Sequence, residues 1–285
     1  MRCAVLGMGR MGQGVAGRLL DNGHDLTIWN RTSGVGVDLV ARGAREAATI
    51  TEAVQDKEVA ITSLANDEAV RSVAIGEGGI RASLPAGGVY LDASTVSPAL
   101  SAELADSFPR YAAMPIMGSP DAVRAGEAVY LIGGDQAVIE FVQPLLAALS
   151  ETIRRYAAAP LASAAKLAVN LLLLDGVVAL AESMAVGRSG GLSDEQLSAL
   201  LRDSPMVAPG LKNRFDGVLS GQQEPWWSAR LGAKDAGLAV ALVEGAGGQL
   251  RATAAVRDLY GQVSDPDRQD IAEVSELYRQ AGRPH

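Results

Sequence analysis

A glycine-rich turn is the feature that most constrains this chain. The segment VLGMGRMGQGVAGRLL places Gly7, Gly9 and Gly12 in the pattern G-x-G-x-x-G, after the apolar run 2–6 and ahead of a helical segment. The first glycine permits a tight turn, the second lets the backbone approach a pyrophosphate, and the third lets helix and strand pack closely. The context favours dinucleotide binding over an ordinary glycine turn. The loop expected at the cofactor comprises Gly7, Met8, Gly9, Arg10, Met11 and Gly12.

The two halves of the chain differ in their periodicity. Short apolar runs alternate with helical segments in the first half, which predicts βαβ units and a mostly parallel sheet. From Pro160 onward the pattern is helical, rich in Ala and Leu, and Gly190–Gly191 end the first long helix. We therefore predict a Rossmann-type α/β domain at 1–159 and an all-helical domain at 160–285. The expected strands are 2–6, 25–29, 58–64, 88–92, 110–114 and 127–132, and the clearest helices are 10–22, 67–75 and 98–107.

Composition narrows the functional class. The net charge of −8, without a basic block, argues against nucleic acid and anionic membrane surfaces as partners. Cys3 is the sole cysteine, so an internal disulfide is impossible and a reducing cytoplasmic setting is expected. No signal peptide or metal-ligand set is recognised. Asp175 and Glu182 interrupt the apolar run 171–186, which we interpret as a buried helix rather than a membrane span.

The end of the second predicted strand indicates which cofactor is preferred. An acidic residue there would accept hydrogen bonds from the 2′-hydroxyl of NAD, but this chain has Asn30, Arg31 and Thr32. Arg31 can pair with a 2′-phosphate and stack on adenine. The sequence therefore favours NADPH, with a solvated loop arginine as the alternative.

The long helix carries an unexpected lysine. In AAKLAVNLLLLDGVV, Lys166 and Asn170 are four residues apart and share one helix face. Burying an unpaired ammonium is costly, so the position calls for a partner or a function. Asp175 and Glu182 fall on the opposite side of the helix and should face solvent, another helix or a second subunit. A lysine that extends its amine to solvent from a helix start is the alternative.

Several ordered motifs together resemble the β-hydroxyacid dehydrogenases, which include 3-hydroxyisobutyrate dehydrogenase and glyoxylate and succinic semialdehyde reductases. The motifs span essentially the whole chain: GMGRMG, DASTVSP at 92–98, MPIMGSPDAVRAG at 114–126, KLAVN at 166–170 and KDAGLA at 234–239. The resemblance implies a Rossmann domain, a helical C-terminal domain, an active site in the cleft between them, and a homodimer or homotetramer.

The resemblance also implies residue roles. Lys166 would be the catalytic acid/base, and Asn170 would hold the substrate or bond its reacting oxygen. An ammonium beside that oxygen stabilises the charge that hydride transfer creates. Thr95 and Lys234 would contact the cofactor, and Ser94 the substrate.

Simpler roles remain open for three of these residues. Ser94 and Thr95 could instead cap a helix ahead of Pro98, and Lys234 could form an ordinary surface ion pair with Asp235. Leu64 and Ala65 would lie near the adenosine half. Trp226 and Trp227 could line the pocket or belong to the core, with Trp227 at a common family Phe position.

Two positions bear on the substrate. The imine reductases, which are relatives, usually lack the lysine, so Lys166 favours carbonyl reduction or its reverse. Where the dehydrogenases read Ser-Gly-Gly, this chain has Met117, Gly118 and Ser119. A thioether cannot donate a hydrogen bond, so a small hydroxy acid would have to be held by backbone amides.

These observations predict an NADPH-dependent oxidoreductase that reduces a small aldehyde or keto compound. An imine reductase-like enzyme is the first alternative. A non-catalytic NADPH-binding protein is the second, and the intact Lys166 and Asn170 argue against it.

Overall fold

The protein folds into two compact units, Met1–Lys166 and Leu167–His285, in a computed structural model that describes residues 1–279. Within the described residues, nine strands of the first unit form a single sheet in the order β3-β2-β1-β4-β5-β6-β8-β7, with β9 beside β8. The strands are β1 (Arg2–Leu6), β2 (Asp25–Trp29), β3 (Arg45–Glu46), β4 (Val59–Thr62), β5 (Val89–Asp92), β6 (Tyr111–Ala113), β7 (Ile116–Met117), β8 (Val129–Gly134) and β9 (Ile153–Tyr156).

The sheet confirms the predicted α/β class. The strands from β3 to β6 are parallel, whereas β8 pairs antiparallel with β6 and β7. The order β3-β2-β1-β4-β5-β6 is that of a doubly wound dinucleotide-binding sheet. Its topological switch point lies between β1 and β4, and ligands bind such sheets outside the carboxyl ends of the strands at that point.

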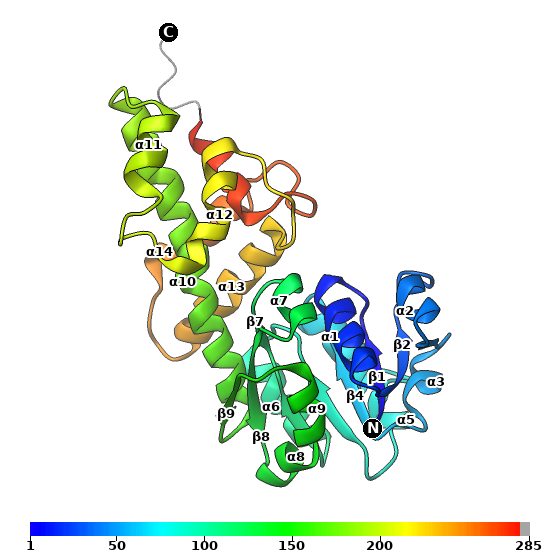
Figure 1. Cartoon of the computed structure of the whole chain (residues 1–285). Coiled ribbons are helices and arrows are strands. Elements are labelled where there is room, and N and C mark those ends of the chain that lie inside the picture. Colours follow the sequence, from blue (N-terminus) through cyan, green and yellow to red (C-terminus); the bar gives the residue numbers. More distant parts are fainter. Residues whose placement is uncertain (280–285) are drawn as a thin grey trace. The chain divides into compact units, whose positions relative to one another are not determined.

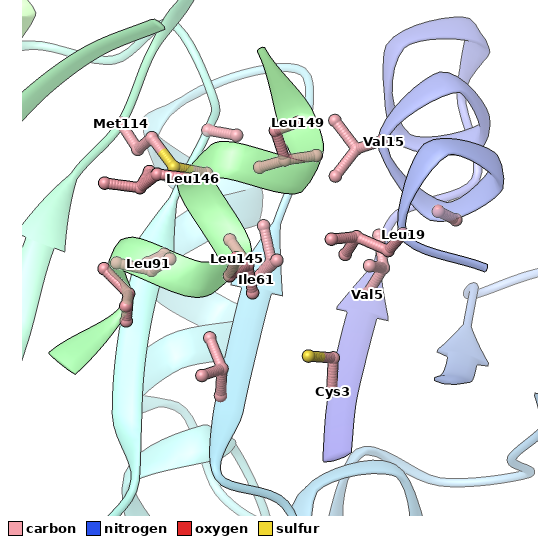
Figure 2. Packing of buried hydrophobic residues seen from close by; sticks show 14 of the residues in the cluster. Cys3, Val5, Val15, Leu19, Ile61, Leu91, Met114, Leu145, Leu146 and Leu149 are labelled. Atoms are coloured by element: carbon pink, nitrogen blue, oxygen red, sulfur yellow. The ribbon is translucent and has the colours of Figure 1, made fainter. Parts of the chain in front are cut away.

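Helices cover both faces of this sheet, as Figure 1 shows. On one face, Val15 and Leu19 of α1 and Leu145 of α9 pack toward Val5 and Ile61 (Figure 2). A second apolar cluster fills the other face, where α3, α4, α5 and α6 pack. The helices are α1 (Arg10–Asp21), α2 (Val37–Ala41), α3 (Ile50–Val54), α4 (Asp67–Ile75), α5 (Ile80–Ser83), α6 (Pro98–Ser107), α7 (Pro120–Ala125), α8 (Gln136–Phe141) and α9 (Gln143–Leu149).

The long helix α10 (Ala159–Ser189) joins the two units. Ala159 and Ala162 in its first turns belong to the apolar cluster of the sheet, which is why the first compact unit extends to Lys166. By length and composition α10 could cross a membrane, although core helices of soluble proteins pass the same test. The helix predicted to be buried is buried on one side only: Leu174, Val177 and Met184 are buried, whereas Leu172 is 78% and Val186 74% exposed.

Helices joined by loops form the described part of the second unit, which also contains a β-bridge between Ser228 and Asp270. Its core forms where α10, α12, α13 and α14 meet, around Leu174, Phe215, Ala236 and Tyr260. The hydroxyl of Tyr260 donates a 2.9 Å hydrogen bond to the carbonyl of Leu174 and so anchors α14 to α10. The elements after α10 are α11 (Asp194–Leu201), α12 (Pro209–Ser220), α13 (Ala229–Gly245), α14 (Arg251–Tyr260) and the 3-10 helix η1 (Ile271–Tyr278).

The two acidic residues of α10 face neighbouring side chains, in line with the predicted polar face opposite Lys166. Asp175 accepts a 2.9 Å hydrogen bond from the hydroxyl of Thr253 in α14. Glu182 accepts one of 3.0 Å from Tyr278. Both carboxylates therefore tie later helical segments to α10.

Candidate active site

The glycine turn after β1 fits a bound dinucleotide. Gly7 has a φ of +102°, and a Cβ there would lie 2.3 Å from the carbonyl oxygen of Ser63. A Cβ on Gly12 would lie 1.9 Å from the carbonyl oxygen of Gly7. Gly9 differs, because its backbone is extended and a Cβ there would meet nothing within 4 Å. The protein's own packing therefore does not require glycine at position 9, whereas close approach of a pyrophosphate would.

The start of α1 suits an anion for a second reason. Among the described residues no side chain caps this helix at Gly9, and its first turn contains no acidic residue. The positive end of the helix dipole is therefore not countered by a carboxylate of that turn. Gln13 donates a 2.9 Å hydrogen bond from Nε2 to the carbonyl of Met8, which fixes the turn.

The residues after β2 include Asn30, which is hydrogen-bonded to the glycine turn, and the exposed cation Arg31. Asn30 accepts a 3.0 Å hydrogen bond at Oδ1 from the amide of Met8 and donates one of 2.9 Å from Nδ2 to the carbonyl of Thr32. Asn30 thus links the glycine turn to the end of β2. Arg31 follows Asn30 and is exposed, so it is accessible to a ligand.

The loops after β4 and β5 are joined by a buried hydrogen-bond network. These two strands are parallel neighbours, so Leu64 and Ala65 lie at the same sheet edge as Ser94 and Thr95. Ser94 is buried, and its Oγ accepts a 2.9 Å hydrogen bond from the amide of Leu64. The amide of Ser94 donates at 3.0 Å to Oδ1 of Asp92, which is also buried.

The capping alternative for Ser94 and Thr95 is not what the structure shows. Ser97 caps α6 instead, accepting a 3.0 Å hydrogen bond from the amide of Leu100. Ser94 is therefore occupied with the loop after β4 rather than with the helix that follows.

The loop after β7 keeps a serine hydroxyl two residues after Met117. Met117 ends the strand half-buried and packs against the core of the first unit. Gly118 has a φ of +142°, a backbone conformation that favours glycine. Ser119 caps α7, with its Oγ accepting a 3.1 Å hydrogen bond from the amide of Ala122. Its hydroxyl proton is not consumed by that bond, so Ser119 retains a donor.

Polar side chains of α10 and α13 form a buried cluster around Asn170 in the second unit. Lys166 and Asn170 are both buried, one helical turn apart. Asn170 donates a 2.7 Å hydrogen bond from Nδ2 to Oδ2 of Asp235, and Nζ of Lys234 lies 2.7 Å from the other oxygen of that carboxylate. Asp235 is only 3% exposed, so its ion pair with Lys234 is not an ordinary surface pair.

Trp226 and Trp227 lie on a segment that a buried ion pair holds in place. Asp270 accepts hydrogen bonds of 3.2 Å from the amides of both Trp226 and Trp227. Nε of Arg214 lies 2.7 Å from Asp270, and both side chains have no exposed surface. The guanidinium stacks 3.5 Å from the ring centroid of Trp226. Trp227 is half-buried against the core of the second unit, so part of this residue remains accessible.

Sequence reasoning missed Asp92, Arg214 and Asp270. Asp92 opens the quoted DASTVSP motif directly after a strand, a position that could have identified it. Asp270 and Glu273 form a capping box, and that spacing is visible in the sequence. Arg214 carries no such signal, because nothing local distinguishes it from a solvated helical arginine.

Comparisons with known proteins cover both units. Residues 2–158 match the NAD binding domain of 6-phosphogluconate dehydrogenase, and residues 161–280 match the NAD-binding domain of NADP-dependent 3-hydroxyisobutyrate dehydrogenase. The uncharacterized oxidoreductase YfjR of Bacillus subtilis is 32% identical over 248 residues, covering 85% of this chain and 86% of that protein. The cytokine-like nuclear factor N-PAC of Xenopus tropicalis is 28% identical over 98% of this chain, which spans about half (53%) of that protein.

Solved structures share the fold. The 3-hydroxyisobutyrate dehydrogenase of Mycobacterium tuberculosis, solved with L-serine, has a TM-score of 0.85 at 24% identity, covering 98% of this chain and 100% of that one. An imine reductase of Streptomyces aurantiacus has a TM-score of 0.65 at 21% identity, with the same coverage of 98% and 100%. The glycine turn, the strand order and the two family matches agree, and the chain belongs to the β-hydroxyacid dehydrogenase family of NAD(P)-dependent oxidoreductases.

Proposed function

We propose that the protein is an NADPH-dependent reductase of a small aldehyde or keto compound, or catalyses the reverse alcohol oxidation. The observation that carries this proposal is the buried pair Lys166 and Asn170 on one face of α10. These two residues occupy the K-x-x-x-N motif of KLAVN, in which the family's lysine is the acid/base. Imine reductases usually lack this lysine, so its presence favours reduction of C=O.

The residues of this cluster have distinct proposed tasks. When bound, the nicotinamide cofactor supplies or accepts the hydride. The ammonium of Lys166 stabilises negative charge on the substrate oxygen and donates the proton that makes it a hydroxyl. Asn170 orients the substrate, and Asp235 fixes the Asn170 amide through its 2.7 Å hydrogen bond. Lys234, beside Asp235, is proposed to contact the cofactor.

The preference for NADPH rests on Arg31. Its exposed guanidinium follows β2, at the end of the strand where an acidic residue would select NAD. Arginine pairs with phosphate through two parallel hydrogen bonds and stacks on aromatic rings. Thr95, Leu64 and Ala65 are proposed to complete the cofactor site from the neighbouring loops.

Substrate choice is proposed to depend on the loop after β7. Met117 presents a thioether where the dehydrogenases carry the serine of Ser-Gly-Gly, so it offers an apolar surface. The backbone of Gly118 and the hydroxyl of Ser119 remain as donors for an anionic group. Ser94 and Trp227 are proposed to line the rest of this site. A substrate with an apolar group at Met117 suits this arrangement better than a very small acid.

The decisive experiment measures NADPH consumption with aldehydes, keto acids and cyclic imines, for the wild type and Lys166→Met. The variant keeps side-chain length and removes the proton donor, so kcat for the preferred carbonyl should fall about 100-fold or more with NADPH affinity nearly unchanged. Lys212→Met is the matched control, because Lys212 is exposed and pairs loosely with Asp203 at 3.7 Å. Near-wild-type turnover by Lys166→Met would refute the role.

Two other functions have specific support. The shared fold with an imine reductase, and the missing serine at position 117, favour C=N reduction as the second candidate. Turnover of cyclic imines but not carbonyls would establish it. A non-catalytic NADPH-binding protein is the third candidate, because the relative N-PAC is named as a nuclear factor and not as an enzyme. Tight NADPH binding without consumption across the panel would support that function.

We further propose that the protein is a homodimer or homotetramer located in the cytoplasm. Val169, Leu172 and Val186 are exposed along α10, and covering such apolar side chains is favourable. The sole cysteine, Cys3, is a buried free thiol, which agrees with a reducing compartment. Light scattering after gel filtration tests the assembly, and a monomer at micromolar concentration would contradict it.

A further inference from the structure

Burying the carboxylate of Asp92 in the first unit is energetically unfavourable unless hydrogen bonds compensate for it. Asp92 ends β5 with 1% of its surface exposed, and a carboxylate in such a place is stable only if hydrogen bonds replace the lost water. Two donors reach one oxygen of this carboxylate. The hydroxyl of Thr62 donates to Oδ1 at 2.8 Å and the amide of Ser94 donates to the same oxygen at 3.0 Å, whereas Oδ2 is buried without a hydrogen-bond partner among the described residues.

The directions of these hydrogen bonds follow from proton counting. Thr62 has one hydroxyl proton, and it goes to Asp92. Tyr90, 2.8 Å from the same Thr62 oxygen, must therefore donate to it. Ser94 accepts a hydrogen bond at Oγ from the amide of Leu64 and donates one from its own amide to Asp92. Two series of hydrogen bonds, Tyr90–Thr62–Asp92 and Leu64–Ser94–Asp92, therefore end on this carboxylate.

The hydrogen bonds from Asp92 through Ser94 to Leu64 lead to the glycine turn. The amide of Leu64 is held by Ser94 at 2.9 Å. A Cβ on Gly7 would lie 2.7 Å from Cδ2 of Leu64 and 2.3 Å from the carbonyl oxygen of Ser63, so this segment lies directly against the turn. A Cβ on Gly12 would be 3.4 Å from Cβ of Ser63. The loop after β4 therefore forms one wall of the turn expected to receive the pyrophosphate.

We propose that Asp92 and Ser94 are positioning residues that hold the loop after β4 against the glycine turn and thereby set the affinity for the dinucleotide. The inference deepens the proposed function and rests on it. Ser94 acts through the amide of Leu64, so its loss changes cofactor binding even without substrate. A residue that only contacted the substrate would leave that affinity unchanged.

The test compares Ser94→Ala with Ser97→Ala by titrating NADPH in the absence of substrate. Both variants remove one serine hydroxyl from the same segment. Ser97→Ala removes the cap of α6 and the hydrogen bond from Ser97 to Asp67 at the start of α4, but it removes no bond to Leu64. Ser94→Ala should raise the Kd for NADPH at least fivefold. Ser97→Ala should lower the thermal midpoint and leave the Kd within twofold.

A second variant guards against a folding failure of the first. Asp92→Asn keeps the side-chain size but removes the negative charge on which both series of hydrogen bonds end. Its Kd for NADPH should therefore also rise more than twofold. A Kd unchanged in both Ser94→Ala and Asp92→Asn, or an equal rise in Ser97→Ala, would overturn the inference. Failure of the wild type to bind NADPH or NADH would instead refute the cofactor assignment, and the inference with it.

Discussion

Asn170 donates a 2.7 Å hydrogen bond from Nδ2 to Oδ2 of Asp235, and both side chains are buried. An ionised carboxylate only accepts hydrogen bonds, so the amide cannot be flipped without placing two oxygens against each other. The orientation of Asn170 is therefore fixed, with its oxygen and second N–H proton available for other partners.

Removing Asp235 should affect turnover through Asn170. In Asp235→Ala the amide loses its partner and can rotate, so kcat should fall about tenfold, which corresponds to one hydrogen bond of about 1.4 kcal/mol. Asp235→Asn keeps an acceptor and should lose less. Asp267→Ala is the control, because Asp267 pairs with Arg230 on the surface. Steady-state kinetics decide, and an Asp235→Ala variant with wild-type kcat would show that Asn170 needs no orienting partner.

Arg31 should determine the choice between NADPH and NADH. We expect at least a tenfold preference for NADPH in kcat/KM, which corresponds to about 1.4 kcal/mol. Arg31→Ala should remove most of this preference through KM, because the 2′-phosphate is remote from the hydride. Arg31→Lys keeps the charge without the planar fork and should be intermediate. Equal use of both cofactors by the wild type would contradict the assignment.

Much of the first unit could be predicted because its signals are local. The runs 2–6 and 25–29 coincide with β1 and β2, and the segments 67–75 and 98–107 coincide with α4 and α6. Asn66 and Ser97 cap those two helices with their side chains, as their residue types favour. The strand β9 was missed because its sequence IRRY is half-exposed and lacks an apolar run.

The candidate site divides in the same way. The spacing of residues in the sequence is enough to identify the glycine turn and the pair Lys166 and Asn170. The bond from Leu64 to Ser94 joins residues 30 apart, and that from Asn170 to Asp235 joins residues 65 apart. Sequence periodicity describes one element at a time, so it cannot reveal which polar side chains two packed elements bury together.

The buried pair of Arg214 and Asp270 should be essential for the stability of the second unit. Asp270→Asn leaves the guanidinium buried without a counter-charge, which typically costs about 3–5 kcal/mol. Exposed pairs contribute little, so Asp216→Asn, which breaks the surface pair with Arg202, should cost less than about 1 kcal/mol. Chemical denaturation followed by tryptophan fluorescence compares them, since Trp226 stacks on Arg214. Equal midpoints for the two variants would exclude this role for the buried pair.

Because of Asp92, the free energy of unfolding should fall as the pH rises from acidic to neutral. Burial raises the pKa of the Asp92 carboxyl from 3.8 to about 6, against the opposing hydrogen bonds of Ser94 and Thr62. The folded state therefore holds the proton more tightly than the unfolded state. The stabilisation is complete below pH 3.8 and is lost as the pH rises through about 6. A pKa difference of this size corresponds to about 3 kcal/mol.

The matched variant for this pH effect is Asp92→Asn, which carries no charge at any pH. Burial keeps the pKa of Tyr90 and Tyr111 well above their usual range, so neither phenol titrates in the window, and the charge of Asp67 raises the pKa of Asp92 slightly. The stability of Asp92→Asn relative to the wild type should rise by about 3 kcal/mol from pH 4 to pH 7.5. Parallel pH profiles of thermal unfolding would contradict the assignment.

Met117 should disfavour very small acids as substrates. Its half-buried thioether would desolvate a carboxylate oxygen without replacing the lost hydrogen bond, at a cost of about 1–3 kcal/mol. Met117→Ser should therefore raise kcat/KM for glyoxylate about tenfold, if the hydroxyl recovers a typical hydrogen bond. Met117→Ala is the control, because it removes the same bulk without adding a donor. The three proteins are compared with glyoxylate, succinic semialdehyde and a neutral aldehyde of similar size. If the wild type already prefers the acids and the serine variant gains nothing, the anion is held by Gly118 and Ser119 instead.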